Sequence, residues 1–270
     1  LDDRPIGVFD SGLGGLTTVR ELCRLLPEED IVYFGDTGRV PYGSRSRETI
    51  VKYARQDVAF LRTFDIKTIV IACGTVSTTA LDGLAAENPF PVLGVVAPAA
   101  RAAARATRSG SIGLIGTQAS IRSGAYERLI RAENPAARVL AQPCPLFVPL
   151  VENGRFRPGD VVIETVAAEY LAPLKEAGVD TLVLGCTHYP LLEKVIGAYM
   201  GPEVRLINSG AEGARAAADC LRERDALAGP GRGSCRCFVS DRQEDFSRLA
   251  STFLGWDVAQ AVEQVDISQY

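Results

Sequence analysis

Short, continuous runs of Val, Ile and Leu recur along this chain and alternate with stretches of helical periodicity. The runs cover residues 6–9, 31–34, 66–72, 91–96, 111–115, 139–141, 181–184, 204–207 and 237–240. A continuous apolar run is typical of a strand that is covered on both faces, and strands that alternate with helices form parallel sheets. We therefore expect an α/β fold built from doubly wound parallel sheets.

Two stretches far apart in the chain look alike. TIVIACGTVS, at residues 68–77, and TLVLGCTHYP, at residues 181–190, each end an apolar run with a small residue, a cysteine and a polar turn. Residues 6–9 resemble residues 112–115 at a similar offset. The repeat predicts two pseudo-symmetric domains with the active site in the cleft between them. We expect residues 1–97 with 210–270 to form the first domain and residues 98–209 the second.

Composition excludes several classes of function. The chain of 270 residues has a net charge of −4 and no basic block, so we expect no binding to nucleic acid. Its apolar runs are too short to cross a bilayer, and the acidic, polar character of residues 1–4 leads us to expect no signal peptide there. Seven cysteines at irregular spacings predict a reducing cytoplasm rather than a disulfide framework, and a single histidine argues against a zinc site.

Cys73 and Cys186 follow the two matching strands, and ligands of such sheets bind beyond the carboxyl ends of the strands. One thiol on each wall of a cleft suits racemisation, in which a base removes a proton from one face of a carbon and an acid returns one to the other face. An unperturbed thiol has a pKa of ~8.5, so both of its forms are accessible near neutral pH. The alternative is that both are buried structural cysteines. Their matched positions favour the catalytic interpretation.

His188 lies two residues after Cys186 and is the only histidine. A protonated imidazole there could stabilise the Cys186 thiolate or a substrate carboxylate, and a neutral one could accept the thiol proton. The alternative is a histidine that forms a hydrogen bond at the start of a helix.

The stretch DSGLGG, at residues 10–15, follows the first predicted strand. It lacks the lysine of a Walker loop and the glycine spacing of a dinucleotide fingerprint. Asp10 suits a substrate ammonium group or the orientation of Cys73, while Ser11 and nearby backbone N–H groups suit a carboxylate. This pattern favours a small zwitterion as the ligand. The alternative is a glycine-rich turn in which Asp10 caps the next helix.

Five stretches match one enzyme family in order and spacing across almost the whole chain. They are IGVFDSGLGGLTTVRELCRLLPEEDIVYFGDTGRVPYGSRS, TIVIACGTVSTTAL, SIGLIGTQASIRSGAYERLI, CPLFVPLVENG and LVLGCTHYPLL. On these motifs the chain resembles the bacterial glutamate racemases, a cofactor-independent family of the aspartate/glutamate racemase superfamily. The resemblance implies two α/β domains, a homodimer, glutamate as substrate and D-glutamate for peptidoglycan synthesis. It also implies that neither a metal nor pyridoxal phosphate is used.

The resemblance assigns roles to individual residues. Cys73 is expected to act on D-glutamate and Cys186 on L-glutamate, and Asp10, Glu152 and His188 are expected to assist them. The positions expected to contact the substrate are Asp10, Ser11, Tyr42, Gly43, Gly74, Thr75, Thr187 and His188.

Gly74 departs from the family pattern, which has Asn before the threonine. Glycine removes the hydrogen bonds of an asparagine side chain, at a cost of ~1 kcal/mol where the partner is left unpaired. On this basis Gly74→Asn is expected to lower the KM for glutamate. Two alternatives stay open, a racemase for aspartate or another amino acid, and a weakly active member with a binding or regulatory role.

Overall fold

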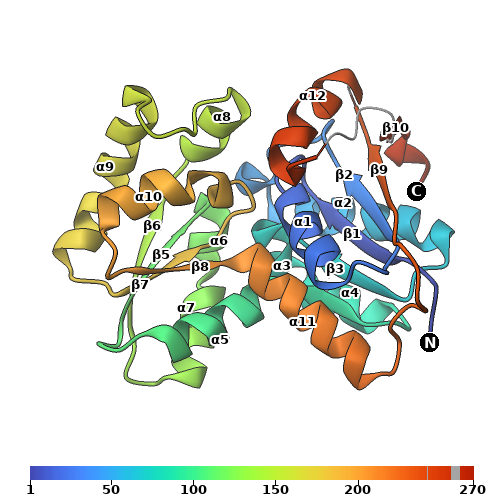
Figure 1. Ribbon diagram of the computed structural model, residues 1–270, viewed down its shortest axis with the longest axis horizontal. Helices are drawn as coiled ribbons and strands as arrows, with labels where there is room; N and C mark the ends of the chain where they lie inside the picture. The colour runs from blue at the N-terminus through green and yellow to red at the C-terminus, as the bar shows by residue number, and fades with distance from the viewer. Residues whose placement is uncertain (242, 257–261) are drawn as a thin grey trace.

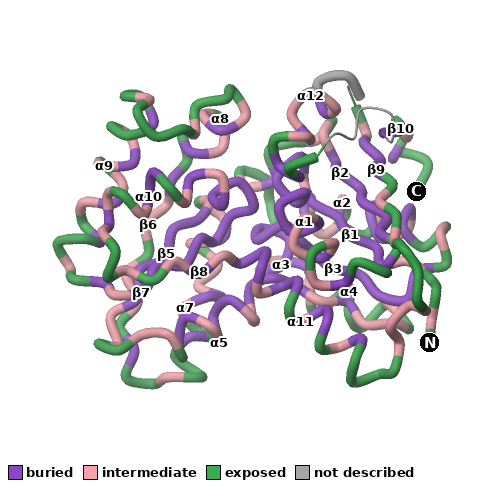
Figure 2. The backbone as a smooth tube through the Cα atoms, in the orientation of Figure 1, coloured by how far each residue is buried: buried purple, intermediate pink, exposed green. Residues whose placement is uncertain are grey.

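The chain folds into two lobes (Figure 1). The computed structural model describes residues 1–241, 243–256 and 262–270. No helix in these ranges combines the length and the apolar character needed to cross a membrane. The central strands lie in the buried interior of each lobe, whereas the edge strands of the sheets are partly exposed (Figure 2).

The first sheet has six strands, and every neighbouring pair is parallel. In spatial order they are β10 (Val262–Gln264), β9 (Cys235–Val239), β2 (Ile31–Gly35), β1 (Ile6–Asp10), β3 (Thr68–Ile71) and β4 (Val92–Gly94). The helices of this part of the chain are α1 (Leu16–Leu25), α2 (Arg47–Leu61), α3 (Gly74–Thr79), α4 (Leu81–Glu87), α11 (Ser209–Glu223) and α12 (Gln243–Leu254). Short 3-10 turns occupy Tyr42–Ser44, Arg62–Phe64 and Ile267–Gln269.

The second sheet has four strands, also all parallel. In spatial order they are β6 (Arg138–Pro143), β5 (Ser111–Gly116), β7 (Thr181–Leu184) and β8 (Arg205–Asn208). The helices that accompany them are α5 (Val96–Ala106), α6 (Gln118–Ser123), α7 (Ala125–Glu133), α8 (Phe147–Glu152), α9 (Val161–Glu176) and α10 (Glu193–Met200), with a 3-10 turn at Tyr189–Leu192. Residues 1–97 with 210–270, and residues 98–209, remain our proposed division into domains.

The strand order and register repeat between the sheets. The order β2-β1-β3-β4 in the first corresponds to β6-β5-β7-β8 in the second. Ile6 lies opposite Thr68 on the cysteine strand of the first sheet, and Ile112 lies opposite Thr181 on that of the second. The α/β fold with two parallel sheets is therefore confirmed, and the two thiols follow equivalent strands.

Three local features are not signalled by the apolar pattern of the sequence. Helix α3 begins at Gly74, directly after Cys73. Its glycine, threonines, valine and serine are weak helix formers, so burial of residues 74–77 stabilises a helix that propensity does not predict. Helices α6 and α7 are separated by Gly124, whose φ of 63° is left-handed. The last strand, β10, was not expected.

Candidate active site

A cavity of about 430 Å³ lies between the two sheets, at the carboxyl ends of their strands. Ten of the eleven residues that the sequence assigned to the site line it. They are Ser11, Tyr42, Gly43, Cys73, Gly74, Thr75, Glu152, Cys186, Thr187 and His188. The exception is Asp10, which lies beneath the cavity wall.

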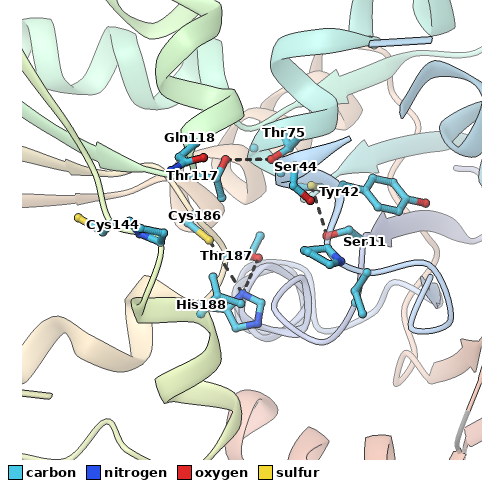
Figure 3. Close-up of a pocket in the computed structure, with 18 of the residues that line it drawn as sticks. Ser11, Tyr42, Ser44, Thr75, Thr117, Gln118, Cys144, Cys186, Thr187 and His188 are labelled. Carbon is cyan, nitrogen blue, oxygen red and sulfur yellow. Dashed lines mark hydrogen bonds between the residues drawn. The ribbon is translucent and has the colours of Figure 1, made fainter. Parts of the chain in front are cut away.

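The two thiols belong to opposite walls of this cavity. Figure 3 shows Cys186 on the wall formed by the second sheet and Ser11 on the facing wall. Cys73 lies with Ser11, since its Sγ is 3.7 Å from the Ser11 hydroxyl oxygen. Cys73 is 5% exposed and Cys186 is 7% exposed, so little bulk water reaches either sulfur. Burial, helped by the nearby charge of Asp10, raises the pKa of Cys73 to about 12.

His188 connects Cys186 to a carboxylate. Its Nε2 is 2.9 Å from Oε1 of Glu152, and its Nδ1 is 4.0 Å from the Cys186 sulfur. Burial alone lowers the pKa of an imidazole, but the interactions with Cys186 and Glu152 outweigh it and raise the pKa of His188 to about 10. The edge-on ring of Phe253, 5.5 Å away between centroids, packs against the imidazole. This arrangement favours a charged His188 beside the thiol at neutral pH.

Asp10 is fully buried and supports the loop that follows β1. Its Oδ2 accepts hydrogen bonds from the backbone N–H groups of Gly12, at 3.2 Å, and Gly15, at 3.0 Å. Burial raises the pKa of Asp10, while the charge of His188 and these backbone donors lower it. The position suits the orientation of the loop and an electrostatic effect on Cys73, and it does not put the carboxylate in the cavity wall.

Tyr42 lines the cavity, but its hydroxyl points away from it (Figure 3). The hydroxyl donates to the buried carboxylates of Asp36 and Asp57. Arg39 pairs with both carboxylates, at 2.6 Å and 2.9 Å. The motif GDTGRVPYG, at residues 35–43, lies in the first stretch that resembles the family, but its pattern alone assigns no role to Asp36 or Arg39. The structure shows that they fix the loop that carries Tyr42 and Gly43.

Several cavity residues were missed by the sequence assignment. Thr117 and Gln118 follow β5, and the apolar side chains of Val148 and Pro149 come from α8. The internal repeat held the signal for Thr117, because the alignment of residues 6–9 with 112–115 places Thr117 opposite Ser11. Cys144 is a third cysteine of the lining, but its sulfur points away from Cys186 (Figure 3). Its burial raises the pKa of that thiol.

Comparison with known proteins shows the same fold and sequence pattern. The model of the Asp/Glu/Hydantoin racemase family matches residues 9–217. A glutamate racemase from Geobacter metallireducens is 49% identical over 253 residues, which are 93% of this chain and 93% of that protein. Glutamate racemase isoform RacE1 from Bacillus anthracis superimposes with a TM-score of 0.93 at 37% identity, covering 98% of both chains.

A structure of glutamate racemase from Francisella tularensis in complex with D-glutamate gives a TM-score of 0.92 at 37% identity, covering 100% of both chains. The family model matches well over half of the chain, and the identity with relatives holds over nearly its full length. The chain belongs to the Asp/Glu/Hydantoin racemase family.

Proposed function

We propose that this chain interconverts L- and D-glutamate, with the thiols of Cys73 and Cys186 as the two acid/base groups. The observation that carries the proposal is the placement of these thiols after equivalent strands, on opposite walls of one cavity. Racemisation requires a proton to leave one face of the α-carbon and another to arrive on the opposite face. Two groups of one chemical type on facing walls can do this in either direction.

Each turnover moves one proton at each sulfur. The thiolate of one cysteine takes the α-proton and becomes a thiol, leaving a carbanion at the α-carbon. The thiol of the other cysteine then gives its proton to the opposite face and becomes a thiolate. The roles are exchanged for the other enantiomer.

The surroundings of the two thiols differ. The high pKa of Cys73, about 12, keeps that group as a thiol at neutral pH. The imidazole of His188 lies 4.0 Å from the Cys186 sulfur on the opposite wall. We assign Cys186 to removal of the proton of L-glutamate and Cys73 to the supply of a proton on the other face, as the family resemblance implies.

The substrate assignment is supported by the relatives. Several are named glutamate racemase, and one structure contains D-glutamate. This chain racemises glutamate accordingly. We further propose that the D-glutamate serves peptidoglycan synthesis, that the protein acts in the cytoplasm, and that it forms a homodimer. These three proposals rest on the family resemblance.

The test replaces each thiol in turn. Cys73→Ser and Cys186→Ser should each lower racemisation, followed by circular dichroism of either enantiomer, by about 10²–10⁴-fold, because a serine hydroxyl is a much weaker acid than a thiol. In D₂O, each variant should still exchange the α-proton of the enantiomer that its remaining cysteine faces. Cys220→Ser is the matched control, since this free, half-buried cysteine lies on α11. Racemisation at the parent rate in both single variants would refute the assignment.

A further inference from the structure

Two glycines flank the thiols and meet across the cleft. Gly74 follows Cys73, and Gly185 precedes Cys186. A Cβ atom added to Gly74 would lie 2.8 Å from the carbonyl oxygen of Gly185, whereas ordinary van der Waals contacts begin at 3.4 Å. The two domains therefore approach each other backbone to backbone, one residue away from each sulfur.

Neither side of this contact can move without disturbing a sheet or helix. The N–H of Gly185 donates to the carbonyl oxygen of Ile115 in β5 at 2.8 Å, and a Cβ on Gly185 would lie 2.7 Å from that same oxygen. On the other side, the carbonyl of Cys73 accepts the N–H of Ser77 at 2.9 Å in the first turn of α3. The atom that a side chain at position 74 would meet is thus a fixed backbone oxygen.

Two hydrogen bonds hold the domains together close to the glycine contact. The Oγ1 atoms of Thr75 and Thr117 are 3.1 Å apart (Figure 3). On α1, the hydroxyl of Thr17 donates to the carbonyl oxygen of Thr187 at 2.9 Å. Both bonds involve residues one or two positions from a catalytic thiol, so a change in the spacing of the domains is transmitted to the sulfurs.

We propose that Gly74 is a positioning residue whose contact with the Gly185 carbonyl sets the separation of the two thiols. The proposal rests on the two-thiol mechanism of the proposed function. Its physical basis is that any side chain at position 74 pushes the walls apart by about half an ångström, from 2.8 Å toward 3.4 Å. Proton transfer from two sides of one carbon requires both sulfurs to be within reach of it at once. A wider gap leaves at least one of them too far away.

This geometry changes the expectation for Gly74→Asn. The sequence predicted a lower KM from a regained hydrogen bond, but the structure places a backbone oxygen where the asparagine Cβ would lie. The variant is now expected to lose turnover.

The test compares Gly74→Ala, the smallest change that adds a Cβ, with Gly83→Ala. Gly83 lies in α4 of the same domain and has no atom within 4 Å of its would-be Cβ. Because a misplacement of 1 Å costs about 100-fold in rate, Gly74→Ala should lose about tenfold in the kcat of racemisation. Exchange of the α-proton in D₂O needs only one sulfur, so it should fall less than racemisation does. Gly83→Ala should keep the parent values of both.

Two results would overturn the proposal. One is a Gly74→Ala variant that racemises within twofold of the parent. The other is an equal loss of exchange and racemisation, which a merely structural defect would produce.

Crystal structures of the parent and Gly74→Ala give a readout that does not depend on activity. The separation of the Cys73 and Cys186 Cα atoms should increase by about half an ångström, as the Cβ contact requires, and an unchanged separation would refute the spacer role. A parent protein that fails to racemise glutamate would refute the proposed function instead.

Discussion

Replacement of Arg39 by methionine removes a cation that pairs with two buried carboxylates. The side chains of Asp36 and Asp57 are 0% exposed, and both lie within 2.9 Å of the Arg39 guanidinium. A third contact joins the guanidinium to the Gln56 side chain at 2.5 Å. Burial, and then the charge of Asp36, raises the pKa of Asp57 well above its usual range. Methionine fills a similar volume but leaves the two carboxylates facing each other.

The expected loss of stability can be converted into a melting temperature. Breaking a buried ion pair by removing one partner costs about 3–5 kcal/mol. An unfolding entropy of about 2.1 cal/mol/K per residue gives about 0.57 kcal/mol/K for 270 residues. Arg39→Met should therefore lower the Tm by about 5–9 °C. Because the same carboxylates hold the Tyr42 hydroxyl, the KM for glutamate should also rise.

Thermal unfolding followed by far-UV circular dichroism measures this effect, and Arg55→Met is the matched control. Arg55 pairs with Glu87 on the surface, where the two side chains are 57% and 43% exposed. Exposed pairs contribute about 0–1 kcal/mol, so the control should lose no more than about 2 °C. A Tm for Arg39→Met within 2 °C of the control would show that the cluster does not depend on its cation, which contradicts the reasoning.

Three further predictions concern the environment of His188 and the loop after β1. Glu152→Gln removes the negative charge 2.9 Å from Nε2 of His188 and should lower the pKa of His188 from about 10. The alkaline limb of the pH–rate profile should therefore move to lower pH. An alkaline limb that does not move would argue against the pairing of Glu152 with His188. The pKa of His188 in the folded protein lies above its ordinary 6.5, so its contribution to stability is fully present below pH 6.5 and is lost as the pH rises to about 10. Urea unfolding should therefore show a larger loss of stability over this pH window in the parent than in His188→Asn. Equal losses in the two proteins would contradict the raised pKa. Tyr33→Phe removes the hydrogen bond of 2.6 Å from the Tyr33 hydroxyl to the Gly12 carbonyl and should lower the free energy of unfolding by about 1–3 kcal/mol. Thermal unfolding measures this loss, and an unchanged Tm would mean that the carbonyl finds another donor.

The fold could be predicted because two signals in the sequence are strong and local. Apolar runs identify the strands, and the repeat of a cysteine after two of them identifies the facing sites. The same signals do not predict the elements whose position depends on tertiary packing. Helix α3 is composed of weak helix formers, and its start at Gly74 depends on burial between the domains. The last strand, β10, has only three residues and joins the edge of its sheet by pairing with β9.

For the site residues, the position near the cavity could be predicted from the sequence, but the orientation of the side chains could not. Cys73, Cys186 and His188 follow recognisable strands, so their position near the cavity could be inferred from the pattern. The direction of a side chain could not be inferred. Asp10 and Tyr42 were both expected to contact the substrate, but the Asp10 carboxylate and the Tyr42 hydroxyl face the protein interior. A strand end fixes where a backbone turns, but the hydrogen-bond partners that orient the side chain come from distant segments.

Gly74 shows most clearly what a sequence cannot report. From the sequence alone, glycine at this position means that the asparagine side chain of the family pattern is missing, which suggests a lost hydrogen bond. In the structure that position is filled by the carbonyl oxygen of Gly185, 111 residues further along the chain and on the other domain, and the missing side chain is what permits the approach. A substitution that restores the family residue must therefore be accompanied by a change in the packing of the domains. Gly74→Asn alone should separate the thiols, and recovery of activity would require a compensating change near Gly185 or Ile115.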